Sequence, residues 1–444
     1  MQCGWDSPEQ IAACLHLATR WFGVLSNIVG LGSFALIALL IWLFRRLRRD
    51  LQKWEQESER ANELKRLAED KARQAEHLAT FAQREAARDK EALETLRAST
   101  GTGEDGLRKE LVEARTELAD KSRRLDDALS MVDGGTEKFW SQPLRGTRFE
   151  QYTDWLRDSI PVLLFCNQKG GVGKSTLVTN LAAAFAAKGE RVLTVDIDYQ
   201  GSHSSLVQLQ LREGPKVPES LIDYLFEDTL DPNWFKLAVR PVKDKIWYIP
   251  AFYSFELIER KFEYRWALGY TRDDVRYRLA KALLSPELQS KFDRILIDAP
   301  PRFTLGFVNG FCAATHLYIP TVVDQLSATA VASFARQFRE LKAALNSRIQ
   351  WSGIIGTLTF RNPQNPLSLT QRGESVANAA ERAAQGILDT KEPLFIRKPV
   401  IVRDADLASA TEEGIAYLND SGVRTMFDEL AAEIEKKAPR KSAK

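Results

Sequence analysis

One segment of this 444-residue chain combines the residue types that bind phosphate. Residues 167–176 read NQKGGVGKST and lie between an apolar run, PVLLFCN, and a helix-like run, STLVTNLAAAFAAKG. A glycine-rich turn between a strand and a helix directs backbone N–H groups and the positive end of the helix dipole at an anion. Lys174 would supply charge to the phosphates and Ser175 a hydroxyl ligand for Mg²⁺. The predicted phosphate-binding residues are Gly170, Gly171, Val172, Gly173, Lys174, Ser175 and Thr176.

This segment departs from the ordinary GxxxxGK[ST] pattern at its start. Position 168, where that pattern has its first glycine, is Gln168. A second lysine, Lys169, stands directly before the double glycine instead. The GK[ST] end of the pattern, placed after a strand and before a helix, is nevertheless specific for nucleotide phosphates.

Two further apolar runs end in carboxylates. RVLTVDID ends with Asp196 and Asp198, and RILIDAP ends with Asp298. Carboxylates at the carboxyl edge of a parallel sheet lie in the crevice where ligands bind. One of them can hold Mg²⁺ or its water, and another can orient the attacking water in phosphoryl transfer. Each aspartate alone could equally be a turn or cap residue, but three of them after a phosphate loop favour a catalytic site.

The elements that must position these residues alternate in type from about residue 158 onward. Short β-branched runs such as KIWYIPA, HLYIPTVV and GIIGTLTF are separated by helix-like segments. Near-continuous apolar strands with crossover helices indicate a parallel sheet covered on both faces. The sequence therefore predicts an α/β domain over residues 158–434, a P-loop ATPase fold with a mostly parallel sheet.

These motifs together resemble the ParA/MinD family of deviant Walker A ATPases. KGGVGKST with Lys169, DIDYQGS and IDAPP resemble the family's deviant Walker A, Walker A′ and Walker B segments, and the likeness runs over about residues 160–430. The resemblance implies a Mg²⁺-dependent ATPase that dimerises around ATP, with Lys169 reaching the partner's nucleotide. It also implies that Asp198 orients water and that Ser175 and Asp298 serve Mg²⁺. Tyr199 stands where the partitioning ATPases usually have proline.

The segment before this domain has a different composition. Residues 21–44 carry no charge, and at ~1.5 Å per residue a helix of this length spans the ~30 Å hydrocarbon core of a bilayer. Trp21 and Trp42 lie near its ends and four arginines follow within residues 45–49. We therefore expect a single-pass protein of the bacterial inner membrane, with residues 1–20 outside and the ATPase domain in the cytoplasm. A cleaved signal peptide is the alternative, and whether Cys3 and Cys14 pair is open.

Residues 45–131 predict a long helical stalk with a break near residues 99–106. Residues 45–98 lack Gly and Pro, and small or leucine side chains recur at heptad spacing, although several charges interrupt the register. A parallel coiled coil and a single helix with many ion pairs both fit this pattern. We expect a linker at residues 132–157 and a basic tail at residues 435–444.

The overall composition excludes several classes of site. The 62 Lys and Arg against 60 Asp and Glu leave a net charge of +2, so no general attraction to nucleic acid is implied. The 4 Cys and 4 His show no zinc-ligand spacing. Arg397, Lys398 and Arg403 occupy the region where ParA-like proteins carry residues for non-specific DNA binding, but a solvated charge cluster is the favoured interpretation.

Three hypotheses of function follow. The leading one is a membrane-anchored ATPase switch that dimerises on ATP and positions or regulates a protein partner. The second is a scaffold that only binds nucleotide, which intact Lys174 and Asp198 disfavour. The third is a bacterial tyrosine-kinase-like protein. That class would require a cluster of tyrosines at the C-terminus, and it is disfavoured because Tyr417 is the last tyrosine of the chain. The pathway and the partner are open at this stage.

Overall fold

The computed structural model describes residues 104–133, 139–142, 147–211, 219–227, 229–360, 362–402 and 405–441, and a few helical positions between 80 and 94. The chain divides into two compact units, Met1–Thr102 and Gly103–Lys444. The account below concerns the second unit. The predicted membrane span, the linker at 134–138 and 143–146, and almost all of the first part of the stalk lie outside the described residues.

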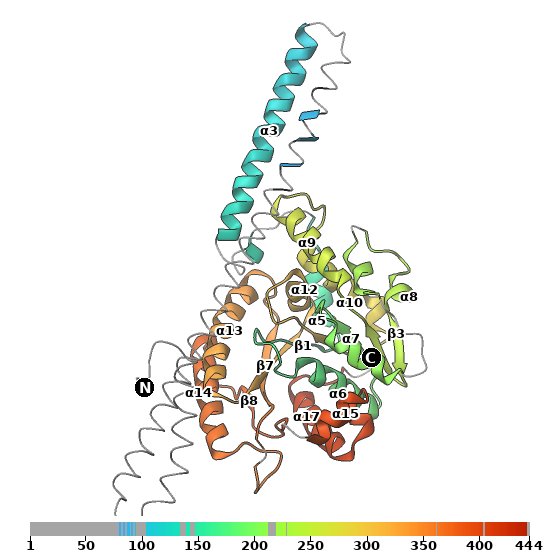
Figure 1. The fold of residues 1–444 in the computed structure, drawn as a ribbon, viewed down its shortest axis with the longest axis vertical. Coiled ribbons are helices and arrows are strands. Elements are labelled where there is room, and N and C mark those ends of the chain that lie inside the picture. The colour runs from blue at the N-terminus through green and yellow to red at the C-terminus, as the bar shows by residue number, and fades with distance from the viewer. Residues whose placement is uncertain are drawn as a thin grey trace, which may run out of the picture. The chain divides into compact units, whose positions relative to one another are not determined.

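The described part of the second unit contains an eight-stranded sheet in the order β3-β4-β2-β5-β1-β6-β7-β8 (Figure 1). Every neighbouring pair is parallel except β3 with β4. The predicted α/β fold with a mostly parallel sheet is therefore confirmed. The strands are β1 Val162–Phe165, β2 Val192–Asp196, β3 Arg240–Lys243, β4 Ile246–Ile249, β5 Arg294–Asp298, β6 His316–Val322, β7 Gln350–Thr357 and β8 Phe395–Ile396.

Helices connect the parallel strands, as right-handed crossovers require. Before the sheet the chain forms α3 Glu104–Asp133 and α5 Tyr152–Asp158. The helices between and after the strands are α6 Lys174–Ala187, α7 Ser202–Gln210, α8 Trp234–Ala238, α9 Ser254–Ala267, α10 Arg278–Leu283, α11 Pro286–Gln289, α12 Leu305–Ala313, α13 Gln325–Ala344, α14 Gln371–Leu388, α15 Ala405–Glu412, α16 Ala416–Asn419 and α17 Ser421–Lys437, with short 3₁₀ helices η1 Ile222–Phe226 and η2 Val275–Tyr277.

Two apolar clusters fill the two faces of the sheet. Because successive strand residues point to opposite faces, Val162 and Leu164 of β1 join one cluster, while Leu163 and Phe165 join the other. The first cluster includes apolar residues of α9, α10, α12, α13 and α14, and the second those of α6, α16 and α17. Burial on both faces explains why the strands read as continuous apolar runs.

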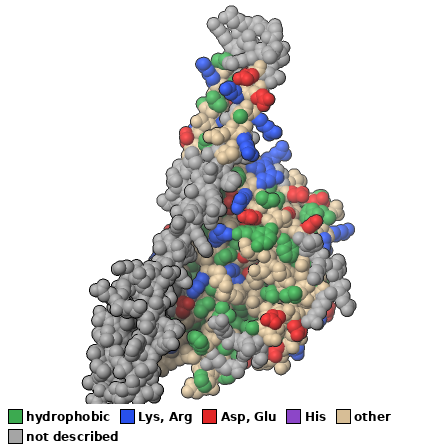
Figure 2. Space-filling model, in the orientation of Figure 1, with side chains coloured by type: hydrophobic (Ala, Val, Ile, Leu, Met, Phe, Trp, Pro, Cys, Tyr) green, Lys and Arg blue, Asp and Glu red, His purple; other side chains and the backbone are tan. Residues whose placement is uncertain are grey.

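Helix α3 is the described part of the predicted stalk. It spans 30 residues, and two of its leucines in heptad positions, Leu111 and Leu118, are 36% and 59% exposed. Figure 2 shows Lys, Arg, Asp and Glu side chains along this helix, and Asp120 pairs with both Arg123 and Arg124. The helix therefore carries ion pairs, as the single-helix alternative predicts, and also exposed apolar side chains in heptad positions. Its pairing with another copy as a coiled coil stays a prediction.

The predicted location at the bacterial inner membrane is contradicted. Among the residues that the structure describes, no helix is both long and apolar enough to cross a bilayer. The apolar helix α12 has 9 residues, about 14 Å at ~1.5 Å per residue, which falls short of a ~30 Å core. The longer helices α3 and α13 carry several charged side chains. Residues 21–44 lie outside the described residues.

Candidate nucleotide site

The phosphate-binding loop connects β1 to α6, as the sequence predicts. Gly171 and Gly173 have φ values of 69° and 81°, which residues other than glycine rarely adopt. Gly173 is the residue before α6, so the loop ends where the first N–H groups of that helix lack partners within it. The loop therefore presents backbone donors at a helix N-terminus, an arrangement suited to an anion.

Hydrogen bonds to two strands hold this loop in place. Asn167 accepts a bond from the N–H of Lys169 at 2.9 Å and donates to the carbonyl of Pro320 on β6 at 2.7 Å. On the other side, the hydroxyl of Thr357 at the end of β7 donates to the carbonyl of Val172 at 2.8 Å. The loop conformation is thus fixed before any ligand binds, which reduces the entropy cost of binding.

Ser175 and Asp298 meet beside the loop. The Ser175 hydroxyl donates to Oδ2 of Asp298 at 2.6 Å. Oδ1 of Asp298 is buried and has no hydrogen-bond partner within the described part of the chain. Burial raises the pKa of Asp298 to about 7, although Ser175 and Lys174 act in the opposite direction. A buried carboxylate oxygen without a partner, next to a hydroxyl, matches the oxygen ligands that Mg²⁺ prefers, so these residues fit the metal.

Lys174 lies among the carboxylates at the same edge of the sheet. Its side chain is only 7% exposed, and its charge partly offsets the burial that raises the pKa of both Asp198 and Asp298. A buried ammonium group is costly unless a negative charge lies nearby. The position of Lys174 therefore favours a ligand that carries several negative charges.

The two aspartates at the end of β2 have different surroundings. Asp196 is fully buried, and its oxygens accept bonds from the N–H of Asp198 and from the N–H and hydroxyl of Ser204. Within the described chain, the carboxylate of Asp198 accepts one hydrogen bond, from the N–H of Gln200 at 3.0 Å. Burial raises the pKa of Asp198, while Gln200, Lys174 and Arg302 lower it. Asp196 therefore shapes the loop, and Asp198 is the carboxylate with oxygen lone pairs left for water.

Lys169 forms an exposed ion pair with Asp324. Its ammonium lies 3.3 Å from Oδ2 of Asp324, just before α13, and the two side chains are 44% and 40% exposed. An exposed pair of this kind contributes little stability, so Lys169 can change partners at small cost. The structure places Lys169 at the rim of the site and Gly170 to Thr176, Lys174 and Asp298 in it.

The chain is similar to known ATPases in sequence. Residues 160–351 match the model of the AAA domain family AAA_31. The chromosome partitioning protein ParA of Caulobacter vibrioides is 28% identical over 254 residues, which cover 56% of this chain and 89% of ParA. The chromosome-partitioning ATPase Soj of Thermus thermophilus is 30% identical over 203 residues, covering 46% of this chain and 71% of Soj.

The chain belongs to the ParA/MinD family of P-loop ATPases. The fold agrees with this assignment. The structure of a Cyanothece McdA(D38A)–ATP complex superposes with a TM-score of 0.50 at 19% identity, covering 64% of this chain and 99% of McdA. The family resemblance predicted from the sequence is thereby confirmed for the ATPase part of the chain, and the fused anchor and stalk are not.

Several residues near the site of this family member were not singled out in the sequence. His203 on α7 is fully buried between Thr179 of α6 and Thr194 of β2, 2.8 Å from each hydroxyl. Burial lowers its pKa to about 3, so it is neutral and serves to hold α6 against β2. Its place in the run GSHSS, three residues after the end of the DxDYQ segment, is the one local signal that could have indicated it.

The loop after β5 is held by residues from distant parts of the chain. Arg302 donates to the hydroxyl of Tyr199 at 2.6 Å, which joins this loop to the loop after β2. Glu263 and Glu259 of α9 accept the first N–H groups of α12, from Leu305 at 3.2 Å and Gly306 at 2.7 Å. These contacts span tens of residues, and no local sequence pattern predicts them.

The cluster suggested for DNA has partners of its own. Arg397 pairs with Glu374 and Glu381 and donates to Asn378, while Lys398 lies 3.7 Å from Glu429. Arg403 lies outside the described residues. Acidic residues therefore already neutralise the two described cations, which agrees with the favoured interpretation of a solvated charge cluster.

Proposed function

We propose that this family member binds ATP with Mg²⁺ and hydrolyses it, and that it works as a switch whose ATP-bound form pairs with a second copy. The observation that carries the proposal is the contact of Ser175 with Asp298, whose second oxygen is buried without a partner in the described chain, beside buried Lys174. McdA, which shares the fold, was solved as an ATP complex. Relatives that share the sequence motifs are partitioning ATPases.

The residues of the chain would divide the work of hydrolysis among them. The loop of residues 170–176 and Lys174 would hold the phosphate oxygens and neutralise their charge. Ser175 and Asp298 would hold Mg²⁺, which supplies further positive charge to the phosphate oxygens when it is bound. Asp198 would accept a hydrogen bond from the attacking water and orient it.

Two features support pairing of ATP-bound copies across this site. Lys169 lies at the rim, half exposed, and its ammonium pairs with Asp324. Large apolar side chains lie exposed on segments next to the site: Tyr253 is 66% and Leu257 69% exposed on the α9 side, and Phe360 is 83% exposed after β7. Burying such side chains against another copy would be favourable.

The size of the full-length protein in solution tests the proposed switch. Light scattering after gel filtration should show twice the mass in Mg²⁺-ATP as in Mg²⁺-ADP. The measurement is made with the Asp198→Ala variant, so that ATP is not hydrolysed while the mass is determined. Lys169→Ala should bind ATP yet stay at the smaller mass. Lys188 is an exposed lysine that pairs with Glu435, and the control variant Lys188→Ala should behave as the parent does. An identical mass in ATP and ADP would show that nucleotide does not control pairing.

A further inference from the structure

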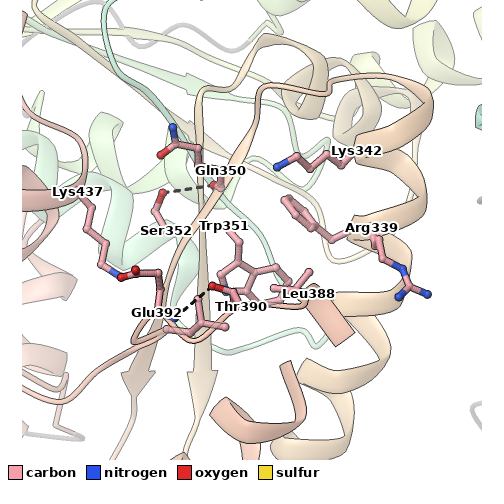
Figure 3. Close-up of a pocket in the computed structure, with 11 residues that line it drawn as sticks. Arg339, Lys342, Gln350, Trp351, Ser352, Leu388, Thr390, Glu392 and Lys437 are labelled. Atoms are coloured by element: carbon pink, nitrogen blue, oxygen red, sulfur yellow. Dashed lines mark hydrogen bonds between the residues drawn. The ribbon is translucent and has the colours of Figure 1, made fainter. Parts of the chain in front are cut away.

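A second cavity lies far from the phosphate loop. It has a volume of about 610 Å³ and is formed by the end of α13, the start of β7, the segment between α14 and β8, and the last residue of α17 (Figure 3). Gln350 at the start of β7 lines it, whereas Thr357 at the other end of this strand contacts the phosphate loop. Seven residues of strand span about 23 Å at ~3.3 Å each, so the cavity is separate from the nucleotide site.

The charges that line this cavity are mostly positive. The lining contains one carboxylate, Glu392, and three basic side chains, Arg339, Lys342 and Lys437. Arg339 donates to the carbonyl of Ile387 at 3.2 Å and Lys437 to that of Pro393 at 2.6 Å. Figure 3 shows Arg339 turned away from the cavity, whereas Lys342 extends into it.

Lys342 has no negative partner within the described chain. Lys342 is half-buried, and its ammonium lies 5.9 Å from the centroid of the Phe338 ring. An ammonium group that loses part of its hydration without gaining a carboxylate is poorly compensated. The cavity therefore offers an unused positive charge.

The cavity wall also offers a flat apolar surface. Trp351 packs edge-on against the buried ring of Phe338, with centroids 5.3 Å apart, and Leu388 lies beside them in the lining. The indole Nε1 of Trp351 is itself buried, so the wall offers the ring and not the N–H to a ligand.

We propose that this cavity binds a small anion with a planar apolar body, whose acidic group contacts Lys342 and whose body lies against Trp351 and Leu388. The volume falls within the range of ~300–1,000 Å³ typical of small-molecule sites. The ammonium of Lys342 selects a carboxylate, sulfonate or phosphate, and the aromatic wall selects a ring system. This site does not depend on the proposed hydrolysis of ATP.

Fluorescence titration with 1-anilinonaphthalene-8-sulfonate tests the proposal on the full-length protein. The titration is made with excess Mg²⁺-ATP present, so that the probe reports only sites outside the nucleotide loop. We expect one saturable site whose affinity falls at least tenfold in Lys342→Ala and severalfold in Trp351→Phe. Lys342→Arg should retain binding, and Lys243→Ala, an exposed lysine of β3 on the other edge of the sheet, should match the parent.

Competition distinguishes a ring-bearing acid from a bare anion. Displacement by 2-naphthoate, with inorganic phosphate ineffective at the same concentration, is the expected result. Displacement by inorganic phosphate alone would overturn the assignment of a planar body. Absence of a saturable site, or equal affinity in Lys342→Ala, Trp351→Phe and Lys243→Ala, would overturn the site itself.

Discussion

Arg302 donates a hydrogen bond to the hydroxyl of Tyr199 at 2.6 Å, and this contact joins the two loops that follow β2 and β5. One of these loops carries Asp198 and the other begins at Asp298. The guanidinium also lies 6.0 Å from the centroid of the Tyr199 ring. The contact therefore ties the loop that carries Asp198 to the loop that follows Asp298.

Tyr199→Phe should lower the rate of ATP hydrolysis with little change in ATP affinity. The variant keeps the ring but removes the acceptor for Arg302, so Asp198 is held less firmly. A hydrogen bond of about 1 kcal/mol corresponds to a loss of roughly fivefold in kcat. Steady-state measurement of kcat and KM checks this. Tyr253→Phe, which removes a hydroxyl from a neighbouring ring 6.1 Å away, is the control, and equal kcat values for the two variants would contradict the role of the contact.

Lys174→Ala should greatly weaken ATP binding. Lys174 is buried among the carboxylates and is the lysine proposed to contact the phosphates, so its removal should weaken binding on the order of 100-fold. Calorimetric titration with Mg²⁺-ATP measures the loss, and circular dichroism verifies the fold. Lys243→Ala serves as the control for losing a lysine. Nucleotide affinity within threefold of the parent would show that the phosphates bind elsewhere.

Asp298→Asn should raise the Mg²⁺ concentration needed for hydrolysis. The amide preserves the size of the side chain and can still accept the Ser175 bond, but it removes the negative charge that Mg²⁺ requires. We expect the half-saturating Mg²⁺ concentration to increase about tenfold or more. Hydrolysis rates over a Mg²⁺ series, with Asp293→Asn as a control on the same segment, provide the test. Superimposable Mg²⁺ curves for Asp298→Asn and the parent would exclude Asp298 as a metal ligand.

Glu259 should make the folded state less stable as the pH rises. Burial and the neighbouring Glu263 raise its pKa to about 8 from an ordinary value of 4.5, and Asp198 acts in the same direction. The folded protein therefore binds the proton more tightly than the unfolded chain does. The stabilisation is complete below about pH 4.5 and is lost as the pH rises to about 8, with a slope of at most about 1.4 kcal/mol per pH unit.

Urea unfolding of Glu259→Gln at several pH values tests this linkage. Glutamine can still accept the Gly306 N–H but does not titrate, so the fall in the free energy of unfolding between pH 6 and 8.5 should become smaller. Glu256→Gln, on the same helix and paired with Arg260 at the surface, should retain the parent slope. A parent slope in Glu259→Gln would mean that this group does not set the pH dependence.

The phosphate loop could be predicted because its chemistry acts through neighbouring residues. Glycines at positive φ, a lysine and a hydroxyl must follow one another between a strand and a helix, so Gly173, Lys174 and Ser175 were recognisable. The meeting of Ser175 with Asp298 also followed, since parallel strands bring their carboxyl ends to one edge of the sheet. Those parts of the site depend on local sequence and on simple topology.

Contacts between distant residues could not be predicted in the same way. Asp196 and Asp198 look equivalent in the sequence, and only the bonds from Ser204 distinguish the structural carboxylate from the available one. The partner of Lys169, Asp324, lies 155 residues further along the chain. The predicted membrane location rested on residues 21–44 alone, and the helices that the structure describes contradict it because they are short or charged.

Single-turnover hydrolysis of ATP by the full-length Asp198→Ala variant tests the central claim most directly. If Asp198 orients the attacking water, this variant should bind Mg²⁺-ATP within about threefold of the parent affinity and hydrolyse it at least about 100-fold more slowly. Its ATP complex should then persist long enough to be isolated. Hydrolysis at the parent rate, with ATP bound normally, would contradict the assignment of this carboxylate and of the site built around it.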